Sequence, residues 1–283
     1  MKDSLIATVK ASIEKMPPLS PVIHKVVQVA NDVTSSAQHL TEVIQMDPVL
    51  TAKVIKMVNS AYFGFSQEIK SLKQAVVILG INTIKNVALS SVVVGNVNVK
   101  ANTVLDGEEF WKHSFGVAAA SKVIAGLIGI DAKLREEYFV AGLIHDIGKV
   151  LINNVFQDEM RKILEVASDE KYPITIIEKK ILGLTHEEIG IAIGKNWKFE
   201  NNLLYAVGKH HAPVTQGKSA VYSMVVSLAN YSINKLEICR MVHGLIEPIP
   251  EEIWTMLNLE ENTLFESLGS IKDEIMKARK FLQ

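Results

Sequence analysis

The chain has 283 residues, of which 48% are hydrophobic and 22% are charged, and this balance excludes an intrinsically disordered polypeptide. Its formal net charge of −1 gives no electrostatic support to nucleic-acid binding by the whole molecule. No apolar run reaches the roughly 18 residues that a membrane-spanning helix needs, and we expect no secretory signal. The one cysteine, Cys239, excludes an internal disulfide and is typical of a reducing cytoplasm.

The first hundred residues carry the start and stop signals of successive helices. Asp47-Pro48 predicts a helix start, because the aspartate side chain can accept bonds from free backbone N–H groups and proline fits the first turn. Ser71, followed three residues later by a glutamine, is a capping-box pattern that opens a helix closing at Gly80. A second helix is predicted from Asn82 to Val94.

Residues 72–92 also resemble a helix-turn-helix, which keeps a DNA-binding regulator among the alternatives. The second helix would offer Asn82, Thr83, Lys85 and Asn86 to a groove, and only one of these is a cation. DNA affinity depends largely on several Lys and Arg contacts with phosphates. The pattern therefore favours two packed helices of ordinary architecture and no nucleic-acid partner.

The polar segment 96–107 is the best candidate for a domain boundary. Beyond it the spacing of apolar residues is helical, and no strand-like alternation persists, so the sequence predicts an all-α protein. Thr185 and Glu188 form a second capping box, which places His186 in the first turn of a helix. We expect helices around residues 108–128, 135–152, 157–168, 173–182, 186–196, 200–210 and 219–235.

Five of the eight histidines lie in the middle region, residues 101–240. Glu109 and His113 are four residues apart on one predicted helix, so both side chains can point at one place. His145 and Asp146 are neighbours, about 100° apart on a predicted helix, and can reach two ions or bridge them. Imidazole and carboxylate groups without a thiolate are typical ligands of iron, manganese, zinc or nickel. The five histidines are His113, His145, His186, His210 and His211.

The order of these residues resembles that of the HD superfamily of metal-dependent phosphohydrolases: His113, then His145-Asp146 with Lys149, then His186, then His210-His211. Within that superfamily, the larger pattern is similar to the HD-related output domain (HDOD) family, over about residues 10–235. The N-terminal segments that carry this similarity are MPPLSP (16–21), DPVLTAK (47–53), NSAYFG (59–64) and AVVILGINT (75–83).

The HDOD resemblance implies an N-terminal helical subdomain packed on an HD-like helical core, in a cytoplasmic protein of bacterial signalling. We place the subdomain at residues 1–100, the HD-like core at 101–240 and a C-terminal helical extension at 241–283. The implied partners are other, unidentified signalling proteins and a phosphorylated small molecule, with no role for a membrane.

The HD-GYP phosphodiesterases are the nearest catalytic relatives that the resemblance implies. Lys149 matches their phosphate-contacting lysine, so Asp146 and Lys149 would be the catalytic residues if the chain were an enzyme. Two departures weigh against activity: residues 212–217 lack the Gly-Tyr-Pro element, and Asn230 stands where a closing aspartate is expected. Asparagine offers a neutral carbonyl without the charge that stabilises a divalent ion. The metal ligands of these relatives map onto Glu109, His113, His145, Asp146, His186, His210 and His211.

The sequence therefore predicts a regulatory signalling domain that binds one or two transition-metal ions and lacks efficient catalysis. Iron is the first expectation for the metal, with manganese, zinc or nickel as alternatives, and Asn230 is included among the candidate ligands. A metal-dependent phosphohydrolase acting on a nucleotide or another phosphoester is the alternative function.

Overall fold

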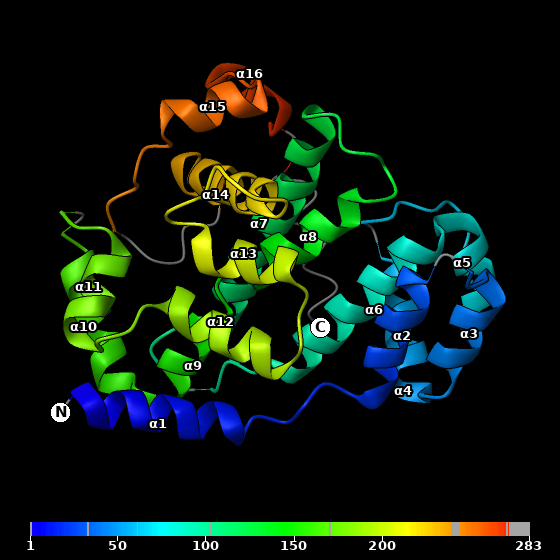
Figure 1. Cartoon of the computed structure of the whole chain (residues 1–283), viewed down its shortest axis with the longest axis horizontal. Coiled ribbons are helices and arrows are strands. Elements are labelled where there is room, and N and C mark those ends of the chain that lie inside the picture. The colour runs from blue at the N-terminus through cyan, green and yellow to red at the C-terminus, as the bar shows by residue number, and fades with distance from the viewer. Residues whose placement is uncertain are drawn as a thin grey trace.

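The computed structural model describes residues 2–32, 34–60, 62–101, 103–169, 171–238, 244–269 and 271. Within these ranges the chain forms sixteen α-helices and no strand, which confirms the all-α prediction (Figure 1). The helices are α1 (Lys2–Glu14), α2 (Pro21–Asn31), α3 (Ala37–Gln45), α4 (Pro48–Val58), α5 (Leu72–Leu79), α6 (Ile81–Asn96), α7 (Gly107–Leu127), α8 (Arg135–Ile144), α9 (Ile147–Val155), α10 (Gln157–Ala167), α11 (Ile174–Ile181), α12 (His186–Asn196), α13 (Asn201–Lys209), α14 (Ala220–Lys235), α15 (Glu251–Leu257) and α16 (Glu261–Ser267).

The capping residues begin helices where the sequence predicts them. The Asp47 side chain accepts hydrogen bonds from the first two free N–H groups of α4, each at 3.0 Å. The Thr185 capping box is complete, so His186 is the first residue of α12. At α5 the Ser71 hydroxyl accepts from the Gln74 N–H, but the Gln74 side chain bonds Lys70 rather than Ser71. That start is therefore correct, although the reciprocal half of the box is shifted by one residue.

The prediction of one helix over residues 135–152 is wrong, because the chain breaks into α8 and α9 at His145-Asp146. Asp146 has φ −99° and ψ 12°, which lies outside the helical range, and its carbonyl oxygen accepts a bond from the Lys149 N–H at 2.9 Å. The two residues are thus presented by a buried turn and not by a continuous helix.

The helices are arranged in two groups with a further pair on top (Figure 1). Helices α2–α6 lie at one end, and α7–α14 form the larger group around the histidines. Helix α1 passes beneath the larger group and packs on α9 and α12, although it precedes α2 in sequence. Helices α15 and α16 contact α14 through Tyr231, whose hydroxyl bonds Glu261. The predicted divisions near residues 100 and 240 stay predictions.

Helix α6 joins the two groups and is buried along most of its length. Its Lys85 ammonium lies 3.1 Å from a Glu137 carboxylate oxygen on α8, and the other Glu137 oxygen accepts a 2.6 Å bond from Tyr222 on α14. Thr83, Lys85 and Asn86, which a DNA-reading helix would have to expose, are all buried. Residues 72–92 are therefore part of the core packing, and the second of their helices is not free to enter a DNA groove.

Gly148 allows α9 and α12 to approach closely, and Gly190 allows α12 to approach α13, so that the histidines on these elements come together. A Cβ atom on Gly148 would lie 2.0 Å from the carbonyl oxygen of His186, and one on Gly190 would lie 2.5 Å from Val207. Real Cβ contacts essentially never come that close, so no larger residue fits at Gly148 without a shift of the backbone. The glycine after the His-Asp pair thus sets the distance between the pair and His186.

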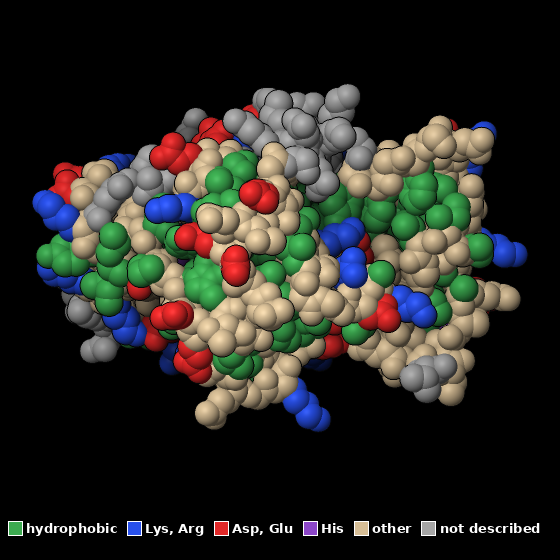
Figure 2. All heavy atoms as spheres, turned by 90° about the horizontal axis from the view of Figure 1, so that it is seen from above, with side chains coloured by type: hydrophobic (Ala, Val, Ile, Leu, Met, Phe, Trp, Pro, Cys, Tyr) green, Lys and Arg blue, Asp and Glu red, His purple; other side chains and the backbone are tan. Residues whose placement is uncertain are grey.

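The surface seen from above carries an acidic region over the C-terminal helices and apolar side chains towards the end where α5 lies (Figure 2). Helices α15 and α16 expose the carboxylates Glu251, Glu252 and Glu261, and α5 exposes Val77 and Ile78. Among the described residues, no helix combines the length and the apolar character needed to cross a membrane. Cys239 lies outside the described residues.

Candidate metal centre

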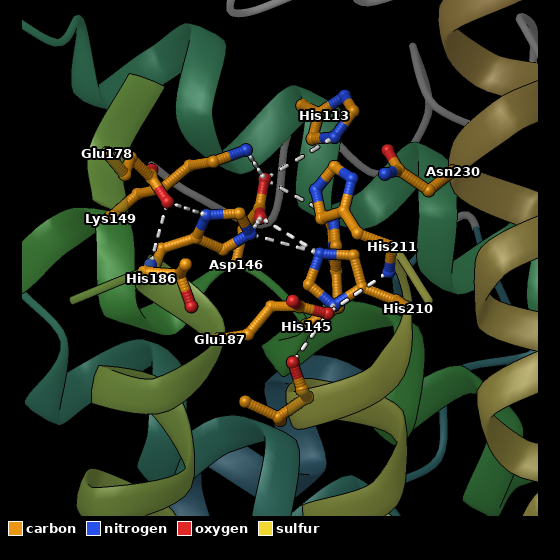
Figure 3. Close-up of polar contacts among 12 residues, drawn as sticks. His113, His145, Asp146, Lys149, Glu178, His186, Glu187, His210, His211 and Asn230 are labelled. Carbon is orange, nitrogen blue, oxygen red and sulfur yellow. Dashed lines mark hydrogen bonds and ion pairs between the residues drawn. The ribbon is translucent and has the colours of Figure 1, made fainter. Parts of the chain in front are cut away.

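Five histidines and one aspartate from four separate parts of the chain meet in the larger helical group (Figure 3). His113 lies on α7, His145-Asp146 in the turn between α8 and α9, His186 at the start of α12, and His210-His211 directly after α13. All except His211 are fully buried, and the His211 side chain is 17% exposed. The structure therefore brings these six predicted site residues together.

The Asp146 carboxylate stands between two groups of histidines. Its Oδ2 atom lies 3.3 Å from Nε2 of His145 and 3.7 Å from Nε2 of His113. Its Oδ1 atom lies 3.3 Å from Nε2 of His186 and 3.6 Å from Nε2 of His210. The potential ligand atoms form two clusters, one of His113, His145 and Asp146 and one of His186, His210 and His211. Asp146 can bridge two ions, one on each side.

Three of the rings are held at Nδ1, so that Nε2 points inward. Nδ1 of His145 lies 2.7 Å from the Gly142 carbonyl oxygen, and Nδ1 of His210 lies 2.9 Å from that of Val207. Nδ1 of His186 lies 2.7 Å from the buried carboxylate of Glu178. With Nδ1 donating to oxygen, a neutral ring presents a lone pair at Nε2, which is the form that ligates metals.

Several nitrogen and oxygen atoms that face into the cluster have no hydrogen-bond partner. The Nε2 atoms of His186 and His210 are only 3.1 Å apart, so two lone pairs would face each other unless a cation or a proton lies between them. Nε2 of His145, Nε2 of His211 and Oδ1 of Asp146 are buried without a hydrogen-bond partner. An unsatisfied buried polar group costs about 1–3 kcal/mol, and coordination to a metal ion would remove that cost. The residues present therefore fit a divalent transition-metal ion.

The protonation states are set by burial and by Asp146. Burial lowers the pKa of His145, and burial together with the neighbouring histidines holds the pKa of His211 well below its ordinary value. At His210 burial opposes the charged form, but the Asp146 and Glu187 carboxylates outweigh it and raise the pKa. Burial also opposes the charge on Asp146, yet His145 and Lys149 hold its pKa well below the usual range. Asp146 is thus held as an ionised carboxylate, and of these three histidines only His210 is shifted towards its charged form.

A pocket of about 440 Å³ opens above the cluster. His113, Lys149, His210 and His211 line it from below, Asn230 lines it from α14, and residues 244–250 close another side. The Lys149 ammonium also forms a 2.7 Å ion pair with Oδ2 of Asp146. A ligand in this pocket would meet histidines, the Lys149 ammonium, the amides of Asn230 and Asn234 and the carboxylate of Glu247.

Two other predicted residues have different positions. Glu109 is exposed near the start of α7, where it pairs with Lys112, and the structure does not bring it into either cluster. We therefore leave Glu109 out of the proposed ligand set. Asn230 is buried on α14 beside His113 and His211, and its Oδ1 accepts a 2.8 Å bond from Asn234 (Figure 3).

The sequence interpretation missed three carboxylates that contact the histidines from outside. Glu178 binds His186, the Glu187 carboxylate accepts a 3.1 Å bond from the His211 N–H, and Glu247 lies 3.5 Å from Nδ1 of His211. Glu178 could have been found, because it lies on the apolar face of α11 with Ile174 and two other isoleucines at helical spacing. Glu247 carries no such signal.

Comparisons of the sequence with known proteins identify a matching family and several relatives. The HDOD domain family matches residues 16–213. An uncharacterized protein of Treponema pallidum (strain Nichols) is 22% identical over 234 residues, which cover 82% of this chain and 45% of that protein. Ribonuclease Y of Latilactobacillus sakei is 27% identical over 151 residues, which cover 53% of this chain and 27% of that protein. The chain thus spans less than half the length of these curated relatives.

Solved structures show the same fold. An HDOD domain protein of unknown function from Geobacter sulfurreducens superposes with a TM-score of 0.82 at 23% identity, covering 99% of this chain and 97% of that chain. A protein of Shewanella amazonensis SB2B, provisionally named a phosphohydrolase, gives a TM-score of 0.76 at 25% identity and covers 98% of both chains. With the family match extending over more than half of its length and the fold shared end to end, the chain belongs to the HDOD family.

Proposed function

We propose that this chain is a regulatory domain of bacterial signal transduction whose histidine cluster binds one or two transition-metal ions, iron first, without efficient hydrolysis. The observation that carries the proposal is the Asp146 carboxylate, whose two oxygens each face a separate set of imidazole nitrogens. Lys149 pairs with Oδ2, but Oδ1 is buried without a hydrogen-bond partner, and such an unsatisfied oxygen is costly unless a further group such as a metal ion joins it. Among solved relatives, a protein of Marinobacter aquaeolei VT8 carries the provisional name of a signal transduction protein.

The proposal of weak or absent catalysis rests on the groups that line the pocket. A divalent metal would supply an activated water and a positive charge for a phosphoryl oxygen. His113, His145, Asp146, His186, His210 and His211 would hold the ions, and Lys149 would contact an anionic ligand. Asn230 presents only a neutral amide to the same pocket, Ala212 and Pro213 carry no acidic group, and the carboxylate that lines it, Glu247, comes from the segment before α15. Losing one carboxylate from such a site costs orders of magnitude in rate.

Elemental analysis of protein purified without an affinity tag or chelator tests the metal site. We expect one or two transition-metal ions per chain, with nitrogen ligands about 2.0–2.3 Å from the ion by X-ray absorption. A protein that stays metal-free after growth and dialysis with iron, manganese and zinc would overturn the proposal.

A metal-dependent phosphodiesterase is the second candidate, and one observation favours it. Lys149 lines the pocket beside the histidines, where an ammonium group could contact a phosphate. Two relatives point in the same direction by name, the Shewanella protein and ribonuclease Y.

Turnover of cyclic-di-GMP and of a generic phosphodiester by iron- or manganese-loaded protein separates the two functions. We expect little turnover by the wild type. Rapid turnover that His145→Ala abolishes would establish the enzyme instead. Activity gained only in Asn230→Asp would identify a disabled hydrolase retained for another use.

A further inference from the structure

A short segment beyond the family-matched residues covers the pocket above the histidine cluster. This roof segment, residues 244–250, lies between the described end of α14 and the start of α15, and each of its residues lines the pocket. The Leu245 N–H donates to the Tyr172 carbonyl oxygen at 3.3 Å, which holds one end of the segment against the chain before α11. Pro248 and Pro250 restrict its backbone, since each proline fixes its own φ.

Glu247 is the charged residue of the roof segment, and it faces a histidine of the cluster. Its Oε2 atom lies 3.5 Å from Nδ1 of His211, and its side chain is 39% exposed. On the far side of the same ring, Nε2 of His211 is buried without a hydrogen-bond partner. A ring nitrogen of His211 also lies near enough to ligand atoms of His186 and His210 to share an ion with them. The His211 ring therefore faces the roof segment through Nδ1 and the histidine cluster through Nε2.

His145, His186 and His210 show the same division between their two ring nitrogens. In each ring Nδ1 meets an oxygen 2.7–2.9 Å away, and Nε2 faces inward. For His186 that oxygen belongs to a carboxylate, Glu178. Such a partner fixes the tautomer and the direction of a metal-binding ring and makes Nε2 a stronger ligand. For His211, Glu247 is the oxygen group in the corresponding place.

We propose that Glu247 is a positioning residue of the metal centre, which holds His211 in the metal-binding orientation and makes the roof segment part of the site. The inference rests on the metal site proposed above. An ion on Nε2 withdraws electrons from the ring and makes Nδ1–H a better donor, so the contact with Glu247 strengthens when the metal binds. Glu247 also brings a negative charge to the side of the pocket where Asn230 offers none.

The proposed contact couples metal binding to the docking of the roof segment. If the docked roof segment raises metal affinity by some factor, the metal must favour docking of the segment by the same factor, because coupling between two equilibria is reciprocal. The roof segment leads directly into α15, so metal occupancy is linked to the position of the acidic C-terminal helices. This is a route by which a metal state becomes visible on the protein surface.

The test is titration of the metal-free full chain with Mn²⁺ by calorimetry. Glu247→Ala should weaken Mn²⁺ binding about 10- to 100-fold. Glu247→Gln should lose less, because its amide oxygen still accepts from Nδ1. Glu252→Ala, which removes an equal charge from an exposed position five residues further on, should bind as the wild type does. In a His211→Ala background, removal of Glu247 should cause no further loss.

Hydrogen exchange measured by mass spectrometry on the same proteins supplies a readout that is independent of affinity. Mn²⁺ should slow exchange across residues 244–249 in the wild type and in Glu252→Ala, but much less in Glu247→Ala. A wild type that binds no metal would overturn the proposed function and this inference together. A wild type that binds Mn²⁺ while Glu247→Ala binds equally well would overturn the inference alone. Equal losses in Glu247→Ala and Glu247→Gln, or an undiminished loss in the His211→Ala background, would exclude the positioning role.

Discussion

The two carboxylate oxygens of Asp146 carry a negative charge at the centre of the histidine cluster. It is fully buried, pairs with Lys149 at 2.7 Å, and lies within 3.7 Å of four histidine nitrogens. Its low pKa, which the neighbouring His145 and Lys149 maintain against burial, keeps it negatively charged. A buried charge of this kind stabilises the protein only while its counter-charges are present.

Asp146→Ala should lower both metal content and thermal stability when the site is filled, because the remaining ligands have less charge with which to neutralise the ion. In chelator-treated protein the same substitution should be milder or even stabilising. Melting curves with and without chelator, together with elemental analysis, separate the two cases. Unchanged metal content in the variant would show that Asp146 does not anchor the ion.

The shifted pKa values of the histidines predict a pH at which the free energy of unfolding of the metal-free protein is highest. The lowered pKa values of His145 and His211 mean that the unfolded chain binds more protons below the ordinary pKa of 6.5, so stability rises with pH there. The raised pKa of His210 means that the folded chain binds more protons above 6.5, so its contribution is lost as pH rises through that raised value. The metal-free protein should therefore be most stable near the ordinary histidine pKa.

Urea unfolding of chelated protein across a pH series checks this optimum. His210→Gln should remove the fall in stability on the alkaline side and leave the rise on the acidic side. A wild-type profile that keeps rising above neutral pH would contradict the assigned direction for His210.

The identity of the candidate ligands could be predicted from their order and chemistry, but their setting could not. The pair His145-Asp146 was expected on a continuous helix, since the residues on both sides are apolar at helical spacing. The break at Asp146 depends on tertiary contacts of the turn, which override local propensity. The exposed position of Glu109 has a similar origin. Positions i and i+4 share a helix face, but Lys112 on the same helix holds the carboxylate at the surface.

At the scale of elements, the contact between α9 and α12 decides whether the two halves of the cluster meet. Gly148 stands against the His186 backbone, and the first residue of α12 is itself a candidate ligand. The capping box of α12 was predictable, because it depends on residues only three apart. The glycine contact was not predictable, because it joins residues 38 positions apart that only the fold brings together.

Gly148→Ala should destabilise the protein by about 2–3 kcal/mol, because the new methyl group meets backbone atoms that cannot rotate away. Metal affinity should fall as well, since His186 would move away from Asp146. Chemical denaturation and metal titration measure the two effects. Gly95→Ala on α6 is the control, because its Cβ would meet only the movable end of the Lys53 side chain, and a similar loss there would contradict the argument.

At the scale of the whole molecule, a buried polar junction ties the α2–α6 group to the larger group. Lys85, Glu137 and Tyr222 come from α6, α8 and α14, and the Lys85 side chain is only 7% exposed. Lys85 also donates to the Asn31 side chain at the end of α2 at 3.2 Å. Because each partner belongs to a different helix, this junction fixes the relative position of the two groups.

Lys85→Met should cost about 3 kcal/mol, since it leaves the Glu137 carboxylate, whose side chain is only 19% exposed, without its cation. Adding Glu137→Gln should recover much of the loss, because the uncompensated charge is then gone. The free energy of unfolding of the single and double variants measures this coupling. Arg161→Met, which breaks an ion pair exposed at the surface, should have little effect. A double variant no more stable than Lys85→Met would show that the charge pair is not what holds the junction.

The distribution of the six candidate ligands along the chain has a consequence for the thermodynamic stability of the folded protein. They come from four segments between residues 113 and 211, so an unfolded chain presents at most adjacent pairs and competes poorly for an ion. A ligand that binds only the native state stabilises it in proportion to the logarithm of its free concentration. If the cluster holds a metal as proposed, each tenfold rise in free metal above Kd adds about 1.4 kcal/mol per site. The free energy of unfolding would then rise with the logarithm of the free metal concentration around the protein.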